Sequence, residues 1–329
     1  MTYNAPRQIA ALLFAALTLA GANGAGAQGA YPNRPITILI GFSAGGTTDI
    51  ITRLISDELR KALGQPIVIE NRPGAGGNIG GELVSKAKPD GYTLLMGSVG
   101  PLAVNASLYK RMPYDNLKDL APITLVAHVP NMLVVNPRTV PAQTLQEFVA
   151  LAKANPGKYF YASTGSGTTS HLSGVLLNLQ AGLDLTHVPY KGAVALNDVL
   201  SGESVQCMFA TIPSAIQLVR GGKLRALAVT SPRRSAGLPE VPTIAESGFP
   251  GFDASSWFGL VGPAGLPREI ATRLQTEIAR ILKQPAMREK FIQQGADPIG
   301  NTPDEFGKYM RDETAKWANI VKVSGAQAD

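Results

Sequence analysis

Short apolar strands alternate with amphipathic helices along this 329-residue sequence, and that alternation limits the possible folds more than any other feature. A strand over residues 36–40 leads into a helix with Thr48 or Thr47 as its N-cap, and Gly64 ends this helix. Further strands are expected at residues 67–70, 92–96, 159–162, 187–190, 205–209 and 224–229. This order of elements predicts an α/β fold with parallel sheets that helices cover.

Two extended segments, residues 123–135 and 257–261, are placed to cross between two halves of the chain. The predicted division is a first lobe of residues 28–127 and 256–329 and a second lobe of residues 128–255. In doubly wound lobes the strand-to-helix turns lie at the carboxyl ends of the strands, so both lobes would present such turns to one cleft. Later helices are expected at residues 144–154, 169–179, 193–200, 213–219, 286–294 and 303–323, with another starting near Pro267.

Two of the strand-to-helix turns, residues 41–49 and 162–171, are rich in glycine and in serine or threonine. The start of a helix has unpaired backbone N–H donors and a partial positive charge, so a turn without bulky side chains can hold a carboxylate or phosphate there. Neither turn contains Lys or Arg. The pair predicts a site that grips a small dianion from two sides, and simple helix capping is the alternative explanation.

The first turn also suggests a hydrolase. Residues 41–45 read Gly-Phe-Ser-Ala-Gly, which matches the G-x-S-x-G nucleophile elbow, so a secreted serine hydrolase that uses Ser43 is the alternative function. An elbow serine needs a base, an orienting acid and an oxyanion hole. Ser43 follows the first strand of the mature chain, so no upstream loop can supply that hole. None of His128, His171 and His187 has the context of a triad base, and we favour a binding protein without catalytic residues.

Other chemical motifs give no support for a cofactor or a metal. Residues 74–80 resemble a dinucleotide fingerprint but have isoleucine in place of its last glycine. The sequence has no P-loop, no H-E-x-x-H motif and no paired-cysteine zinc pattern, and its one cysteine, Cys207, is expected in a buried strand. The net charge of +6 comes from scattered basic residues without interleaved aromatics, which argues against nucleic-acid binding.

The first 27 residues are typical of a secretory signal peptide. Arg7 supplies a positive start, residues 9–19 form an apolar stretch too short for a stable membrane span, and residues 25–27 (Ala-Gly-Ala) form a cleavage site. We expect a mature chain that begins near Gln28. A retained membrane anchor is the alternative.

Seven segments resemble the periplasmic solute-binding proteins of tripartite tricarboxylate transporters, known as the Bug or TctC family. They run through the whole mature chain, at residues 31–36, 42–49, 70–77, 89–94, 188–192, 222–230 and 256–260. The resemblance implies a two-lobed Venus flytrap of type II-like topology that closes on a carboxylated solute. It implies a periplasmic protein, which we expect to be a monomer, with integral-membrane transporter subunits as partners. A receptor that senses the solute is the open alternative.

The resemblance also implies which residues bind. In the family, backbone amides and hydroxyls of the two turns hold one solute carboxylate, which fits the lack of arginine in both turns. Mapped onto this sequence, with Ser98 added at a strand end, the candidate ligand-binding residues are Phe42, Ser43, Ala44, Gly45, Gly46, Thr47, Ser98, Ser163, Thr164, Gly165, Ser166, Gly167, Thr168, Thr169, Tyr190, Ala210 and Thr211.

Three positions depart from the family pattern. Ser43 stands where family members often have proline, and Ala210 and Thr211 stand where many have Asp-Asn. The missing carboxylate removes a partner for a ligand ammonium or hydroxyl group. We therefore expect a di- or tricarboxylate, or an aromatic carboxylate, rather than an amino acid.

Overall fold

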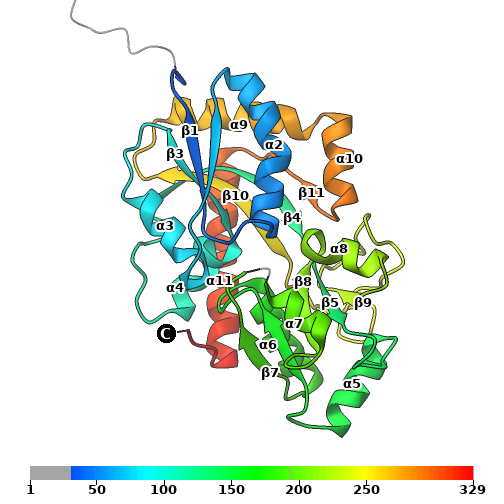
Figure 1. The fold of residues 1–329 in the computed structure, drawn as a ribbon. Coiled ribbons are helices and arrows are strands. Elements are labelled where there is room, and N and C mark those ends of the chain that lie inside the picture. The colour runs from blue at the N-terminus through cyan, green and yellow to red at the C-terminus, as the bar shows by residue number, and fades with distance from the viewer. Residues whose placement is uncertain (1–30, 193, 329) are drawn as a thin grey trace, which may run out of the picture. The chain divides into compact units, whose positions relative to one another are not determined.

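The computed structural model describes residues 31–192 and 194–328, without the side chain of Ser324 (Figure 1). Residues Arg34–Asp329 form one compact unit. The predicted signal peptide, residues 1–27, lies outside the described residues. Within the described ranges, no helix is both long and apolar enough to cross a membrane.

Strands and helices alternate as the sequence predicts. The strands are β1 (Ile36–Ile40), β2 (Ile67–Asn71), β3 (Thr93–Ser98), β4 (Leu120–Val129), β5 (Asn131–Val135), β6 (Phe160–Ser163), β7 (Thr186–Pro189), β8 (Cys207–Thr211), β9 (Arg225–Val229), β10 (Ser256–Pro263) and β11 (Asp297–Pro298). The α-helices are α2 (Thr47–Leu63), α3 (Asn78–Ser85), α4 (Asn105–Leu108), α5 (Leu145–Ala154), α6 (Thr169–Ala181), α7 (Ala195–Ser201), α8 (Ile212–Arg220), α9 (Arg268–Leu282), α10 (Pro285–Gln293) and α11 (Pro303–Ser324). Two short helical segments, η1 (Ala75–Gly77) and η2 (Gly100–Val104), precede α3 and α4.

The first sheet has the strand order β11-β4-β10-β3-β1-β2. β1 lies between β2 and β3 and runs parallel to both, with Ile38 opposite Ile69 and Leu94. β10 runs antiparallel to β3 and to β4, and β11 runs antiparallel to β4. Helices α2 and α9 pack against each other and against this sheet (Figure 1).

The second sheet, in the order β7-β6-β8-β5-β9, repeats this arrangement. β6 lies between β7 and β8 and runs parallel to both, while β5 runs antiparallel to β8 and β9. In each sheet, three parallel strands are followed by an antiparallel strand from a crossing segment. Because the parallel strands end at the same edge, the turns that follow β1 and β6 hold equivalent positions in the two sheets.

The chain crosses between the sheets twice, near the predicted places. Only Pro130 separates β4 from β5, yet β4 belongs to the first sheet and β5 to the second. The chain returns at β10, which pairs with β4. The prediction of parallel sheets holds for three strands of each sheet. It fails for β5 and β10, the strands that carry the chain across, because they enter their sheets in the reverse direction.

Helix α2 shows how the sequence builds the end of the first turn. Its fully buried apolar residues recur on one face, as the amphipathic pattern predicts: Ile51, Ile55 and Leu59. Gly64 ends the helix with a φ of 68°, a conformation that glycine adopts without strain. The predicted N-cap was wrong, because Gly46 occupies that position and Thr47 is already helical. The helix therefore starts without a capping side chain.

Candidate functional site: a pocket between two helix starts

Both glycine- and hydroxyl-rich turns lie between a parallel strand and a helix. The first turn joins β1 to α2, and the second joins β6 to α6. No side chain caps the start of α2, so the N–H groups of its first helical turn have no side-chain acceptor from the N-cap. In α6 the Thr168 hydroxyl accepts a hydrogen bond from the His171 N–H at 3.4 Å. Each helix start brings N–H donors and a partial positive charge to the end of its sheet.

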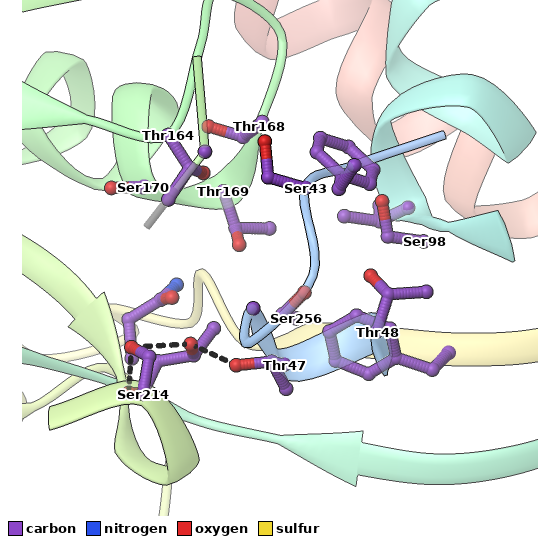
Figure 2. A pocket seen from close by; sticks show the side chains of 17 residues that line it. Ser43, Thr47, Thr48, Ser98, Thr164, Thr168, Thr169, Ser170, Ser214 and Ser256 are labelled. Carbon is purple, nitrogen blue, oxygen red and sulfur yellow. Dashed lines mark hydrogen bonds between the residues drawn. The ribbon is translucent and has the colours of Figure 1, made fainter. Parts of the chain in front are cut away.

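The two turns meet at a pocket (Figure 2). Among the described residues, 17 line this pocket, and none of the 17 carries a formal charge. Most of them bear a hydroxyl group, and the hydroxyls of both turns surround the same space in Figure 2. The lining residues are Phe42, Ser43, Gly46, Thr47, Thr48, Ser98, Val99, Asn131, Thr164, Thr168, Thr169, Ser170, Gly192, Thr211, Ser214, Ser256 and Phe258.

The side chain of Asp49 holds the backbone of the first turn in place. Its side chain is buried, and Oδ2 accepts hydrogen bonds from the Gly45 N–H at 3.0 Å and from Arg53 Nε at 2.9 Å. Burial by itself would raise the pKa of this carboxyl, but the bonds from Arg53 and Gly45 hold the pKa below its ordinary value. Asp49 is therefore ionised at neutral pH, and Arg53 balances its charge beneath the pocket.

Hydroxyl groups link the two sides of the pocket. Ser43 Oγ donates to the backbone oxygen of Lys191 at 3.3 Å. Thr47 Oγ1 lies 2.5 Å from Thr211 Oγ1, and Thr211 Oγ1 donates to Ser214 Oγ at 3.0 Å. Because Thr211 gives its only hydroxyl proton to Ser214, Thr47 is the donor to Thr211. Figure 2 shows this chain of hydrogen bonds, which joins the start of α2 to the end of β8.

Two buried polar atoms at the pocket have no hydrogen-bond partner within the described part of the chain. They are Asn131 Oδ1 and Ser170 Oγ. Asn131 Nδ2 donates to the backbone oxygen of Ala254 at 3.1 Å. This bond orients the side-chain amide so that its oxygen, Oδ1, is the atom without a partner. Because buried polar groups are normally hydrogen-bonded, both atoms are candidates for a bond to a solute or to ordered water.

The structure brings part of the predicted site together. The predicted residues that line the pocket are Phe42, Ser43, Gly46, Thr47, Ser98, Thr164, Thr168, Thr169 and Thr211. Gly165 and Tyr190 instead line a second hollow, together with the loop at residues 73–77. There the Tyr190 hydroxyl donates to Asp198 Oδ2 at 2.6 Å. Burial and this hydrogen bond raise the pKa of Tyr190 to about 12, so its hydroxyl stays a neutral donor that Asp198 already uses.

The other predicted residues line neither hollow. They are Ala44, Gly45, Ser163, Ser166, Gly167 and Ala210. Ala210 is fully buried in the core of the second sheet, because neighbouring residues of β8 point to opposite faces. Gly45, Ser163 and Gly167 form hydrogen bonds within their own turns.

Sequence reasoning missed part of the lining: Thr48, Val99, Asn131, Ser170, Gly192, Ser214, Ser256 and Phe258. Phe258 lines the pocket from β10. Asn131 and Ser256 are the first residues of β5 and β10, where the chain enters each sheet after a crossing. A polar residue at the start of each otherwise apolar crossing strand is the signal that could have revealed them.

The surroundings of Ser43 do not match a hydrolase site. Its hydroxyl donates to a backbone carbonyl rather than to a histidine. A serine–histidine contact does occur between Ser163 Oγ and His187 Nε2, at 2.7 Å, but Ser163 is fully buried. Among residues 31–192 and 194–328, no group of three or more His, Cys, Asp and Glu side chains could hold a metal ion.

Two similar α/β halves around one uncharged cleft, with a helix start on each side, define a solute-binding protein. The profile of the Tripartite tricarboxylate transporter family receptor matches residues 51–326, so the chain belongs to this family. Protein BugT of Bordetella pertussis is 40% identical over 299 residues, which cover 90% of this chain and 91% of BugT. The predicted family is confirmed.

Solved structures of similar proteins share the fold. Rpa4515 of Rhodopseudomonas palustris, solved with adipate, has a TM-score of 0.87 and 36% identity over 90% of this chain and 99% of its own. The periplasmic binding protein BugD has a TM-score of 0.85 and 35% identity over 91% and 100%. MatC from Rhodopseudomonas palustris, with bound malate, has a TM-score of 0.83 and 34% identity over 88% and 100%. The predicted binding-protein fold is confirmed.

Proposed function

We propose that this protein is a periplasmic receptor that captures a small carboxylate between its two turns and presents it to the membrane subunits of a tripartite tricarboxylate transporter. It acts as a monomer and catalyses no reaction. The signal-peptide pattern of residues 1–27 supports export, as does the likeness to the periplasmic protein BugD. We assign residues 28–127 with 256–329 to the first lobe and residues 128–255 to the second, while β4 of the first sheet extends past this boundary to Val129.

One observation carries the proposal: the starts of α2 and α6 reach the same pocket, and no lining residue of the described chain is charged. A carboxylate accepts several hydrogen bonds at once, and fixed backbone N–H groups at helix starts supply them without a side-chain cation. An amino-acid or amine ligand would need an acidic group in the wall to neutralise its ammonium, and the 17 lining residues provide none.

The lining of the pocket and the ligands of two similar proteins favour an aliphatic dicarboxylate. Adipate in Rpa4515 and malate in MatC are both dicarboxylates, and both proteins are similar to this chain along nearly its whole length. Phe42 and Phe258 offer apolar surface to a short methylene chain, while the hydroxyls and amides of the turns face its ends. Citrate and benzoate represent the tricarboxylate and aromatic classes that a ligand screen should include.

A thermal-shift screen of the mature protein, from Gln28 onward, tests the proposal. The panel is succinate, malate, adipate, citrate, benzoate and glutamate. A ligand that binds only the folded state stabilises it by about 2.7 kcal/mol at 100 times its Kd, so the melting temperature rises with concentration. We expect the dicarboxylates to give the largest rise and glutamate none. A panel in which no carboxylate raises the melting temperature would refute the proposal.

Ser98 allows a matched test of the charge of the site. It lies at the end of β3, lines the pocket and is 6% exposed. Ser98→Asp places a negative charge in the wall and is expected to weaken dicarboxylate binding roughly 100-fold or more, because like charges brought together cost several kcal/mol. Ser98→Asn adds similar bulk without charge and is expected to weaken binding far less. Equal losses in calorimetric titrations of both variants would argue against an anion site.

A further inference from the structure

The two turns are supported in the same way, although their sequences differ. Gly45 in the first turn and Gly167 in the second have positive φ angles of 79° and 83°. Each donates its N–H to a side chain four residues ahead, in the first turn of the following helix. Gly45 donates to Asp49 Oδ2 at 3.0 Å, and Gly167 donates to His171 Nδ1 at 3.4 Å. We call such a side-chain acceptor a brace: a carboxylate braces the first turn and an imidazole the second.

His187 braces the second turn at another point. Its ring stacks on that of His171, with ring centroids 4.0 Å apart and planes inclined by 21°. His187 Nε2 lies 2.7 Å from Ser163 Oγ, which accepts a hydrogen bond from the Gly165 N–H at 3.1 Å. Ser163 is fully buried, and its hydroxyl has no other acceptor in the described part of the chain. The buried hydroxyl therefore donates to His187 Nε2.

Both imidazoles must be neutral to act as braces. An imidazolium carries N–H on both ring nitrogens and cannot accept a hydrogen bond. The hydrogen bonds assign the Nε2–H tautomer to His171 and the Nδ1–H tautomer to His187. Burial lowers the pKa of His171 to about 4. Burial and, to a smaller extent, the neighbouring His171 lower the pKa of His187 to about 3. Both rings are therefore neutral at pH 7.

The elements packed against α6 are β6, β7, β8 and α11. The titratable groups on these elements are compatible with neutral rings of His171 and His187. On β6, the ring of Tyr161 lies 5.0 Å from that of His187, tilted by 30°, and its hydroxyl donates to the backbone oxygen of His171 at 3.2 Å. On β8, burial raises the pKa of the Cys207 thiol to about 12. On α11 the buried charged group is Glu313, whose Oε2 already accepts two indole N–H groups.

We propose that His171 and His187 are positioning residues of the solute site, which hold the second turn in the shape that binds a solute carboxylate. The inference rests on the proposed function. Neither ring lines the pocket, so the pair acts through Gly167 and Ser163. The choice of imidazole has a physical reason. Asp49 has Arg53 to balance its charge, whereas α6 contains no Lys or Arg, and a second carboxylate there would repel the bound anion.

The tautomers give the first test. The chain has three histidines, so the ring nitrogens of ¹⁵N-histidine-labelled mature protein can be resolved by NMR. At pH 7, with and without adipate, we expect His171 as the Nε2–H tautomer and His187 as the Nδ1–H tautomer. The opposite tautomer at either residue, or a protonated ring, overturns the inference.

Calorimetric titration with adipate gives the second test. His171→Asn keeps an uncharged acceptor at the position of the second turn that corresponds to Asp49 in the first. We expect the affinity of this variant for adipate to lie within about threefold of wild type. His171→Leu removes the acceptor and leaves the buried Gly167 N–H unpaired, so we expect a loss of at least about tenfold. His128→Asn changes the third histidine, which lies outside both turns, and should leave the affinity unchanged.

The outcomes separate the two proposals. If the wild-type protein binds no carboxylate, the proposed function fails, and the tautomers alone decide whether the braces exist. If His171→Leu folds and binds adipate as tightly as wild type, the positioning role is overturned while the proposed function stands. If His171→Leu does not fold, the tautomers of the wild type and the affinity of His171→Asn decide. A His171→Asn variant that binds adipate at least about tenfold more weakly than wild type counts against the inference.

Discussion

At the scale of single residues, Thr47 uses its side chain and its backbone for different purposes. Its hydroxyl donates its only proton to Thr211, so that hydroxyl cannot also donate to a carboxylate. Its backbone N–H belongs to the uncapped first turn of α2 and stays available. The side chain therefore links the two sides of the pocket, while the main chain supplies the donor for an anion.

This division predicts the effect of removing either hydroxyl. Thr47→Val and Thr211→Val keep the shape of the side chain and lose the cross-pocket bond. Each is expected to weaken dicarboxylate binding about fivefold, because one hydrogen bond contributes about 1 kcal/mol. The double variant should bind about as weakly as Thr211→Val alone, since that change already removes the bond that Thr47→Val removes. Calorimetric titration of the four proteins checks this, and fully additive losses would contradict it.

At the scale of elements, Glu313 anchors the second crossing to the C-terminal helix. Its Oε2 accepts hydrogen bonds from Trp257 Nε1 at 2.8 Å and from Trp317 Nε1 at 2.9 Å. Trp257 lies on β10, and both indoles are buried. Lys316 lies 3.3 Å from Glu313 Oε1 and compensates its charge. One carboxylate thus satisfies two buried donors from different elements.

Glu313→Leu is expected to lower the free energy of unfolding by about 2–5 kcal/mol, because each buried indole N–H left unpaired costs about 1–3 kcal/mol. Glu313→Gln keeps a carbonyl acceptor and should cost less than half as much. Asp312→Leu, at an exposed position of the same helix, is the control and should change stability little. Urea unfolding measures all three. Similar losses for Glu313→Leu and Asp312→Leu would rule out the anchor.

At the scale of the whole molecule, the three histidines link stability to pH. Burial lowers the pKa of His128, His171 and His187 in the folded protein, whereas the unfolded chain titrates near 6.5. As the pH falls through 6.5, the unfolded chain takes up protons that the folded protein does not, so stability is lost. The loss begins below the unfolded pKa and continues until the folded pKa is reached.

Between pH 7.5 and 5.5, we therefore expect each strongly shifted histidine to remove about 1 kcal/mol from the free energy of unfolding. Urea unfolding at the two pH values measures the change. His171→Asn removes one of the titrating groups and should reduce the pH dependence by a similar amount. A wild-type protein equally stable at both pH values would show that the rings are not kept neutral by folding.

Much of the fold could be predicted, because local sequence determines it. The strand at 36–40, the helix that Gly64 ends and the extended segment at 123–135 each follow from apolar spacing or from one residue's backbone preference. The antiparallel entry of β5 and β10 could not be predicted, because strand direction depends on how the chain returns from the other sheet. Gly46 as N-cap also escaped prediction, since neighbouring threonines are the commoner choice.

The site was predicted only in part for a similar reason. Small residues beside a helix start are visible in sequence, so both turns were found. Asn131, Ser256 and Phe258 reach the pocket from crossing strands, and only the pairing of distant segments places them there. Ser163 and Gly167 are the opposite case: both lie in a predicted turn, but they form hydrogen bonds to His187 and His171 and do not line the pocket.

The pairing of β4 with β10 has a mechanical consequence. The two crossings are hydrogen-bonded into one antiparallel ribbon, from Ser256 opposite Val129 to Pro263 opposite Leu120. Sliding one strand along the other would break many ladder bonds at once, whereas twisting the ribbon keeps them. Any rotation of one sheet against the other would therefore have to follow the twist of this ribbon. The register shifts between Phe258 and Val261 are the places where the ribbon bends most easily.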